Sequence, residues 1–319
     1  MKSDKKIVVI GGGTGVFTVL SGLRKHFADL TAIVTMADDG GSTGVLREEF
    51  GILPPGDVRR ALVALSGHDN AMLAKLFNYR FAEGNGLSGH SFGNLMLAAL
   101  ERITGSFPRA IEEAGNMLGV EGRVLPVTLT KTRLHAELEN GKIVDGEANI
   151  DVPTHDGRLR ISRVWLKPSA RSTPAARAAI MEADAVLIGP GDLYTSIIPN
   201  ILVRGVPEAL QQTKAKKIYV VNLMTKFGET NGFAASDFVH TLERYLGENV
   251  LDTVIANSNT PGPARLRPYS HEGAALVGVD AGHFPQKPEL VRADLLRARG
   301  FLRHDSDKLA RVVKKLVEG

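Results

Sequence analysis

The chain has 319 residues, of which 43% are hydrophobic and 6% aromatic, so its core must depend mainly on aliphatic side chains. It contains no cysteine, which excludes disulfides, cysteine-ligated metal sites and a cysteine nucleophile. The net charge is only +4, and no basic tail or aromatic-interleaved basic patch is present, so nucleic acid is not an expected partner.

The N-terminal segment has the pattern of a β–α–β unit. Ile7–Ile10 is a short β-branched run, which predicts a buried parallel strand and not a signal peptide. Apolar residues at helical spacing predict a helix over Val16–Phe27, and Thr31–Met36 is predicted as a second strand. Nowhere does the chain approach the roughly 20 apolar residues of a membrane-spanning helix. We therefore expect a cytoplasmic protein without a membrane span.

The middle of the chain changes its pattern twice. A long loop, Ala37–Gly56, is predicted first. Helices are then predicted over Asp57–Ser66, Asn70–Tyr79, Ser91–Ile103 and Pro108–Leu118. From residue 121 to 168 apolar and polar residues alternate, with a hairpin signal at Asn140-Gly141. This predicts a β-rich insertion, 121–168, within one domain that covers residues 1–319.

Strands and helices alternate again in the second half. Predicted helices are Pro174–Ala183, Val206–Thr213, Ala235–Leu246 and Ser306–Val317, the last capped by Asp305 or Ser306. Predicted strands are Ala185–Ile188, Ile218–Asn222 and Thr253–Asn257. The whole pattern predicts a Rossmann-like α/β fold with a mostly parallel sheet flanked by helices.

The first glycine-rich loop follows the first strand and opens a helix. It consists of Gly11, Gly12, Gly13, Thr14 and Gly15. Glycine lets the backbone approach a phosphate closely, and a helix start supplies free N–H groups and a positive dipole end. The spacing fits neither G-x-G-x-x-G nor a P-loop. A phosphate or ribose contact is expected, with a tight turn that binds nothing as the alternative.

The second loop follows the second strand. It contains Asp38, Asp39, Gly40, Gly41 and Ser42. Its glycines suggest another close backbone approach to a ligand, and the two carboxylates together could hold a divalent cation that bridges phosphates. The alternative is an Asx-turn with solvated charges.

The third loop follows the strand at Ala185–Ile188. Its candidate ligand-binding residues are Gly189, Pro190, Gly191, Tyr194, Thr195 and Ser196. Ligands of open α/β sheets collect beyond the carboxyl ends of the strands, so three such loops predict one cleft. Asn94, Asn222 and Thr225 are weaker candidates for its rim. Asp57 is expected only to cap its helix, and Arg59 and Arg60 to be surface charges.

Several motifs together resemble a known family. IVVIGGGTG, IVTMADDGGSTGVLR, PPGDVRRALVALS, GHSFGNLMLAAL, LIGPGDLYTSIIPN and NLMTKFGET resemble the bacterial gluconeogenesis-factor (YvcK-like) family. That family is related to the 2-phospho-L-lactate transferases of deazaflavin cofactor synthesis (CofD-like). The match extends from Ile7 to the closing RHDSDKLA.

The resemblance implies a CofD-like fold and a cytoplasmic protein needed for growth on gluconeogenic carbon, cell shape and envelope synthesis. It also implies binding of UDP-N-acetylglucosamine or a related UDP-sugar, without assigned catalysis. Tyr269 and Arg303 match positions that the family uses for the nucleotide sugar. A tyrosine can stack on a base and an arginine can clamp a diphosphate. Asp192 departs from the family's usual serine, and we expect it to point away from the ligand.

Two hypotheses follow. In the first, the chain is a regulator that binds a UDP-sugar, because no nucleophile or base can be named and no histidines show metal-ligand spacing. In the second, it is a transferase of the phospholactate type with a metal at Asp38 and Asp39. A nicotinamide dehydrogenase would leave the second and third loops unexplained. A homodimer and envelope-synthesis proteins are conceivable partners.

Overall fold

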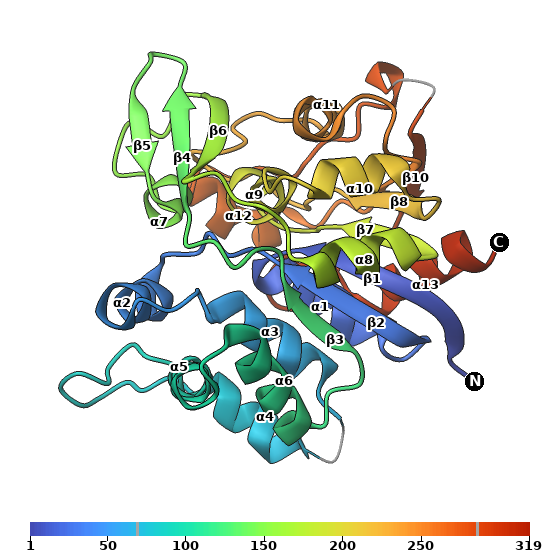
Figure 1. The fold of residues 1–319 in the computed structure, drawn as a ribbon. Coiled ribbons are helices and arrows are strands. Elements are labelled where there is room, and N and C mark those ends of the chain that lie inside the picture. The colour runs from blue at the N-terminus through green and yellow to red at the C-terminus, as the bar shows by residue number, and fades with distance from the viewer. Residues whose placement is uncertain (68–69, 285–286) are drawn as a thin grey trace.

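The computed structural model describes residues 1–67, 70–284 and 287–319, and it is built around one large sheet (Figure 1). The strands of this sheet are, in spatial order, β10 (Glu289–Ala293), β9 (Thr253–Asn257), β8 (Lys216–Val220), β7 (Ala185–Ile188), β1 (Ser3–Gly11), β2 (Phe27–Val34) and β3 (Arg123–Pro126). All neighbouring strands pair in parallel. The predicted Rossmann-like α/β class is confirmed.

The centre of the sheet is fully buried. Ile7–Ile10 of β1 pairs with β2 on one side and β7 on the other, and these residues are at most 2% exposed. From β1 the chain builds β2 and β3 on one side, and after the middle segment it builds β7 to β10 on the other. The order therefore reverses between β1 and β7, which is the switch point where open sheets bind ligands.

Helices cover both faces of the sheet (Figure 1). One layer packs α1 against both α3 and α13, and the other packs α8 and α11 against α10. Their bounds, with those of the remaining α-helices, are α1 (Gly13–Leu23), α2 (Gly41–Phe50), α3 (Gly56–Leu65), α4 (Ala71–Asn78), α5 (Phe92–Thr104), α6 (Phe107–Leu118), α7 (Glu147–Asp151), α8 (Pro174–Glu182), α9 (Ile198–Ile201), α10 (Val206–Gln212), α11 (Ala235–Leu246), α12 (Pro263–His271) and α13 (Ser306–Glu318). A π-helical turn, Leu193–Ile197, precedes α9.

A second, antiparallel sheet lies beside the large one, at the upper left of Figure 1. It is formed by β5 (Ile143–Asp145), β4 (Arg133–Leu138) and β6 (Ile161–Lys167). The predicted insertion, 121–168, contains this small sheet and the short helix α7. Its first strand, β3, pairs with β2 and so belongs to the large sheet.

Several elements were not predicted, among them the short helices α7 and α9, and several boundaries differ: β1 begins at Ser3 instead of Ile7, and β2 ends at Val34 instead of Met36. The segment Ala37–Gly56, predicted as a loop, contains α2, and β10 and α12 had no counterpart in the prediction. Phe27, predicted as the end of a helix, begins β2 and is 1% exposed. The predicted cap Asp305 is confirmed, since its side chain accepts backbone N–H groups of α13, and Ser91 caps α5 in the same way. Within the described ranges, no helix combines the length and the apolar character needed to cross a membrane.

Candidate functional site

The carboxyl ends of β1, β2, β7 and β8 open into one cavity of about 930 Å³. All three glycine-rich loops contribute to its wall, so the predicted convergence holds. The predicted residues that line it are Gly12, Gly13, Thr14, Gly15, Asp38, Gly40, Gly41, Ser42, Asn94, Pro190, Gly191, Thr195, Ser196, Asn222, Thr225, Tyr269 and Arg303.

The first and third loops meet at the switch point. A Cβ atom at Gly15 would lie 1.8 Å from the carbonyl oxygen of Pro190, so only glycine allows this approach. Asn200, which is fully buried on α9, donates to the carbonyl oxygens of Gly11 and Ser196 and ties the loops together. The π-helical turn is therefore held against the start of α1.

Asp57 is part of the site, contrary to the prediction that it only caps its helix. It makes no capping bond, and its Oδ1 instead accepts the backbone N–H of Gly13 at 2.9 Å. Arg60 lies 3.2 Å from the same oxygen. The Asp57 side chain is almost fully buried, and burial raises the pKa of its carboxyl. One amide of the glycine loop is thus already satisfied within the protein.

Arg59 was predicted to be a surface charge, but it is 5% exposed. Its Nε donates to Asn94 Oδ1 at 3.0 Å, and Asn94 Nδ2 donates to Ser42 Oγ at 3.2 Å. Burial lowers the pKa of Arg59 to about 10, which still leaves it charged at neutral pH. Because both ends of its amide are engaged, Asn94 holds Arg59 and Ser42 in place at the cavity wall.

The paired aspartates of the second loop point in different directions. Asp38 lines the cavity and accepts the N–H of Gly40, whereas Asp39 leaves the cavity and accepts the N–H of Ala148 at 2.8 Å. Burial and the nearby Asp57 raise the pKa of Asp38 to about 6. The carboxylate that accompanies Asp38 in the cavity is therefore Asp57, and the predicted Asp38–Asp39 metal pair is not formed.

The small sheet adds a wall of carboxylates that the sequence did not predict. Glu147 and Asp151 lie at the two ends of α7 and line the cavity. Burial and the neighbouring Asp38 raise the pKa of Glu147 to about 9. The bond from Ala148 to Asp39 anchors this helix to the second loop.

Asp192 was expected to point away, but it lines the cavity. Lys226 lies between two carboxylates, with Nζ 2.7 Å from Asp151 and 3.5 Å from Asp192. Burial alone would lower the pKa of Lys226, but Asp192 and Asp151 outweigh it and raise that pKa. Asp151, Asp192 and Glu229 lie close enough together to hold a cation. The ammonium group of Lys226 already neutralises part of that cluster.

Some predicted residues lie outside the cavity wall. Tyr194 is 1% exposed and belongs to the core, although its backbone N–H helps to hold the loop by donating to Glu229. Gly11 and Gly189 continue the strands, where the N–H of Gly189 donates to Ile10. These residues therefore position the loops without lining the cavity.

The two late residues suggested by the resemblance do reach the cavity. Arg303 is exposed at the wall, and its Cζ lies 5.6 Å from the centroid of the Phe301 ring. Tyr269 accepts the backbone N–H of Leu302 at 2.7 Å, so its hydroxyl fixes the segment that carries Arg303. Tyr269 also packs against a small apolar cluster with Leu302 and Leu296.

The arrangement favours an anionic ligand despite its carboxylates. α1 and α2 both begin at the cavity, and glycine N-caps leave both starts without a capping side chain of their own, although Asp57 accepts the first N–H of α1. Uncapped helix starts offer N–H groups and a positive dipole end to an anion. Three basic side chains that the loop motifs did not predict as ligands also line the cavity, namely Arg59, Arg60 and Arg80.

The fold and this cavity define a member of the CofD family. A sequence model described as 2-phospho-L-lactate transferase CofD matches residues 7–296, which is most of the chain. The chain belongs to this family.

Relatives of the chain are similar over nearly its whole length. A protein of Nostoc sp. is 46% identical over an alignment of 319 positions, which covers 98% of this chain and 69% of that protein. The Bacillus subtilis relative named gluconeogenesis factor is 41% identical, and the match covers 100% of both chains. A crystal structure of a Bacillus halodurans protein of the UPF0052 family superposes with a TM-score of 0.93 at 40% identity, covering 98% of this chain and 100% of that one.

Proposed function

We propose that this chain is a cytoplasmic gluconeogenesis factor that binds a nucleotide sugar of the UDP-N-acetylglucosamine type. The observation that carries the ligand class is the convergence of three glycine-rich loops, two helix starts with glycine N-caps and several guanidinium groups on one cavity. A diphosphate suits these donors. The whole cavity, of about 930 Å³, is also large enough for a nucleoside and a sugar.

The physiological role is proposed from the relatives. The Bacillus subtilis relative, which matches this chain over its full length, is named gluconeogenesis factor. We extend that role here to growth on gluconeogenic carbon, cell shape and envelope synthesis, with envelope-synthesis proteins as partners. Regulation by ligand binding is favoured over catalysis, since Asp57 and Arg59, the buried charges next to the glycine loop, are both tied to protein groups.

The alternative is a phosphotransferase of the 2-phospho-L-lactate transferase type. The observation that favours it is the pair Asp38 and Asp57, because burial raises the pKa of both carboxyls and Asp57 adds to the rise at Asp38. A divalent cation at this pair would relieve their repulsion and bridge them to phosphate oxygens. This chemistry would require turnover of a phosphate ester, which phosphorus NMR would detect.

A thermal-shift titration tests the proposal. UDP-N-acetylglucosamine at 100 times its Kd should stabilise the protein by about 2.7 kcal/mol. For a chain of 319 residues this corresponds to a Tm increase of about 4 °C. NAD should produce no increase. A shift only with a deazaflavin or a guanine nucleotide would favour the transferase, and no shift with any nucleotide would contradict both.

Arg303→Ala provides the residue-level test. Loss of a charge-assisted hydrogen bond should raise the Kd for UDP-N-acetylglucosamine about 10- to 100-fold. The Tm without ligand should stay the same because the side chain is exposed. Arg299→Ala is the matched control, since Arg299 is exposed on the same segment and does not line the cavity. Equal affinities of the two variants would remove Arg303 from the site.

A further inference from the structure

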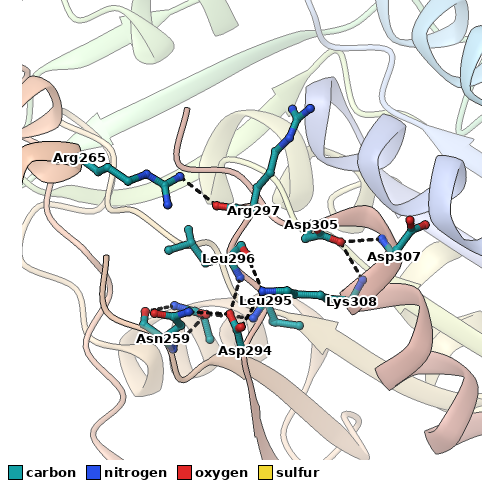
Figure 2. A network of polar contacts seen from close by, with 10 residues as sticks. Asn259, Arg265, Asp294, Leu295, Leu296, Arg297, Asp305, Asp307 and Lys308 are labelled. Carbon is teal, nitrogen blue, oxygen red and sulfur yellow. Dashed lines mark hydrogen bonds and ion pairs between the residues drawn. The ribbon is translucent and has the colours of Figure 1, made fainter. Parts of the chain in front are cut away.

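The segment after β10 is held as a rigid strap over the cavity. Residues 294–305 leave the sheet, turn at Gly300 and return to α13, with the backbone N–H of Arg297 bonded to the carbonyl of Arg303. Figure 2 shows how side chains fix its outgoing limb: Arg265 donates to the Arg297 carbonyl oxygen, and Lys308 reaches Asp294 at 2.6 Å and the Leu296 carbonyl oxygen at 2.9 Å.

Further contacts fix the tip of the strap. Arg265 also donates to the carbonyl oxygen of Gly300 at 3.2 Å, and the N–H of Leu302 donates to Tyr269. The Leu302 side chain is 6% exposed and sits in the apolar cluster with Leu296 and Leu223. The backbone on both sides of residue 301 is therefore tied down.

Phe301 contrasts with this setting because its side chain is 74% exposed. It lines the cavity, and the guanidinium of Arg303 lies over its ring. Single exposed apolar side chains are common, but among those of the described residues only Phe301 and Val152 line the cavity, and only Phe301 is aromatic. A ring that faces a nucleotide cavity offers a stacking surface for a base.

Tyr269 carries the other phenyl-type ring among the described cavity residues, but its ring and hydroxyl already make contacts within the protein. Its hydroxyl accepts the N–H of Leu302, and its ring packs against the apolar cluster beneath the strap. The cavity wall elsewhere combines glycines, hydroxyls, carboxylates and guanidinium groups, which suit the diphosphate and the sugar, with aliphatic side chains such as Val152, Leu223 and Met224, which offer no ring to stack on. The base of a nucleotide therefore has one free aromatic face to meet.

We propose that Phe301 is the base-stacking residue of this cavity and that Arg303 leaves the Phe301 ring for the diphosphate when a nucleotide binds. In the ligand-free protein the guanidinium covers the ring face at 5.6 Å. Binding exchanges this cation–π contact for base stacking on the ring and for charge-assisted hydrogen bonds to phosphate. The inference rests on the proposed function and adds the residue that recognises the base.

The test compares a complete nucleotide with a ligand that lacks the base. In Phe301→Ala the Kd for UDP-N-acetylglucosamine should increase about tenfold or more. The Kd for inorganic pyrophosphate should change less than about twofold, because pyrophosphate has nothing to stack. Phe50→Ala is the matched control: Phe50 is also exposed, at 46%, and has Arg102 5.9 Å from its ring centroid, but lies outside the cavity.

A fluorescence readout reports stacking directly. The chain has one tryptophan, Trp165 in β6, so a Trp165→Phe, Phe301→Trp variant carries a single indole at the strap. Its emission should be quenched by UDP-N-acetylglucosamine and not by pyrophosphate.

The outcomes separate the two proposals. Unchanged nucleotide affinity in Phe301→Ala, or an equal loss for nucleotide and pyrophosphate, would overturn base stacking while the proposed function stands. Absence of nucleotide binding by the unmodified protein would overturn both.

Discussion

Glu147 shares the cavity with other carboxylates, and the fold opposes its ionisation. Burial is the largest cause of the raised pKa of Glu147, and the negative charges of Asp38, Asp151, Asp39 and Asp57 add to it. No salt bridge is recorded for Glu147 among the described residues, unlike Asp151, which pairs with Lys226. Glu147 therefore holds its proton in the folded protein at pH values where the unfolded chain has lost it.

This gives a pH-dependent prediction. The pKa of Glu147 is raised from 4.5 to about 9, so its stabilising effect is complete below about pH 4.5 and declines as pH rises toward 9. Glu147→Gln lacks this decline. Between pH 7 and 9, above the pKa of Asp38, the free energy of unfolding of the unmodified protein should fall by about 2 kcal/mol more than that of the variant. Urea unfolding followed by circular dichroism, with chelator present, measures this difference.

Glu48→Gln is the control, because the Glu48 side chain is 71% exposed and lies outside the cavity. Its pH dependence should match that of the unmodified protein. Parallel curves for all three proteins would show that Glu147 ionises freely in the fold.

The positions of single residues were predictable where the backbone conformation requires a particular residue type, such as glycine in a tight turn. Glycines after strands had to lie at the carboxyl edge, and they do. Asp57 and Arg59 were misjudged because a charge at a helix start is usually solvated, and only the tertiary fold shows that Gly13 and Asn94 lie opposite them. Tyr194 was misjudged for the converse reason, since the π-helical turn directs its ring into the core.

The contact between the first and third loops is the tightest packing at the site. Gly15→Ala would place a Cβ atom 1.8 Å from the Pro190 carbonyl oxygen. Both atoms belong to the backbone, so the start of α1 or the third loop would have to shift. We expect a loss of at least about 2 kcal/mol in unfolding free energy and weaker nucleotide binding, because the two loops must separate. Denaturant unfolding and ligand titration measure the two effects.

Gly278→Ala is the matched control, because a Cβ atom at Gly278 would meet nothing within 4 Å. Its stability should change by less than about 0.5 kcal/mol. If Gly15→Ala behaves in the same way, the loops are not held in the close contact described here.

Regular elements were predictable where a periodic apolar face exists. The strands β1, β2 and β7 were placed from continuous apolar runs. α2 was missed because Gly41 and Gly44 are poor helix formers, and the helix depends on long-range bonds such as those from Arg47 to Asp38 and Thr132. α12 has no buried residue and β10 is a partly exposed edge strand, so neither shows the apolar periodicity from which a helix or strand is predicted.

The whole molecule explains why the site draws on distant parts of the sequence. β1 and β2 supply the first two loops, β7 and β8 supply the third loop and Lys226, and the strap follows β10 at the other edge of the sheet. Because all of these strands are parallel, every segment that leaves a carboxyl end emerges on one side. The cavity is therefore lined by both halves of the sheet and by the strap.

Hydrogen exchange can test this arrangement in the intact protein. Saturating UDP-N-acetylglucosamine should slow amide exchange together in residues 12–15, 40–44, 190–196 and 297–304, since one ligand spans all four segments. Residues 247–250, which line a separate hollow of about 530 Å³, are the internal reference and should show no change. Slower exchange in a single loop, with the strap unaffected, would mean that the segments do not act as one site. Protection at residues 247–250 instead would place the ligand in that second hollow.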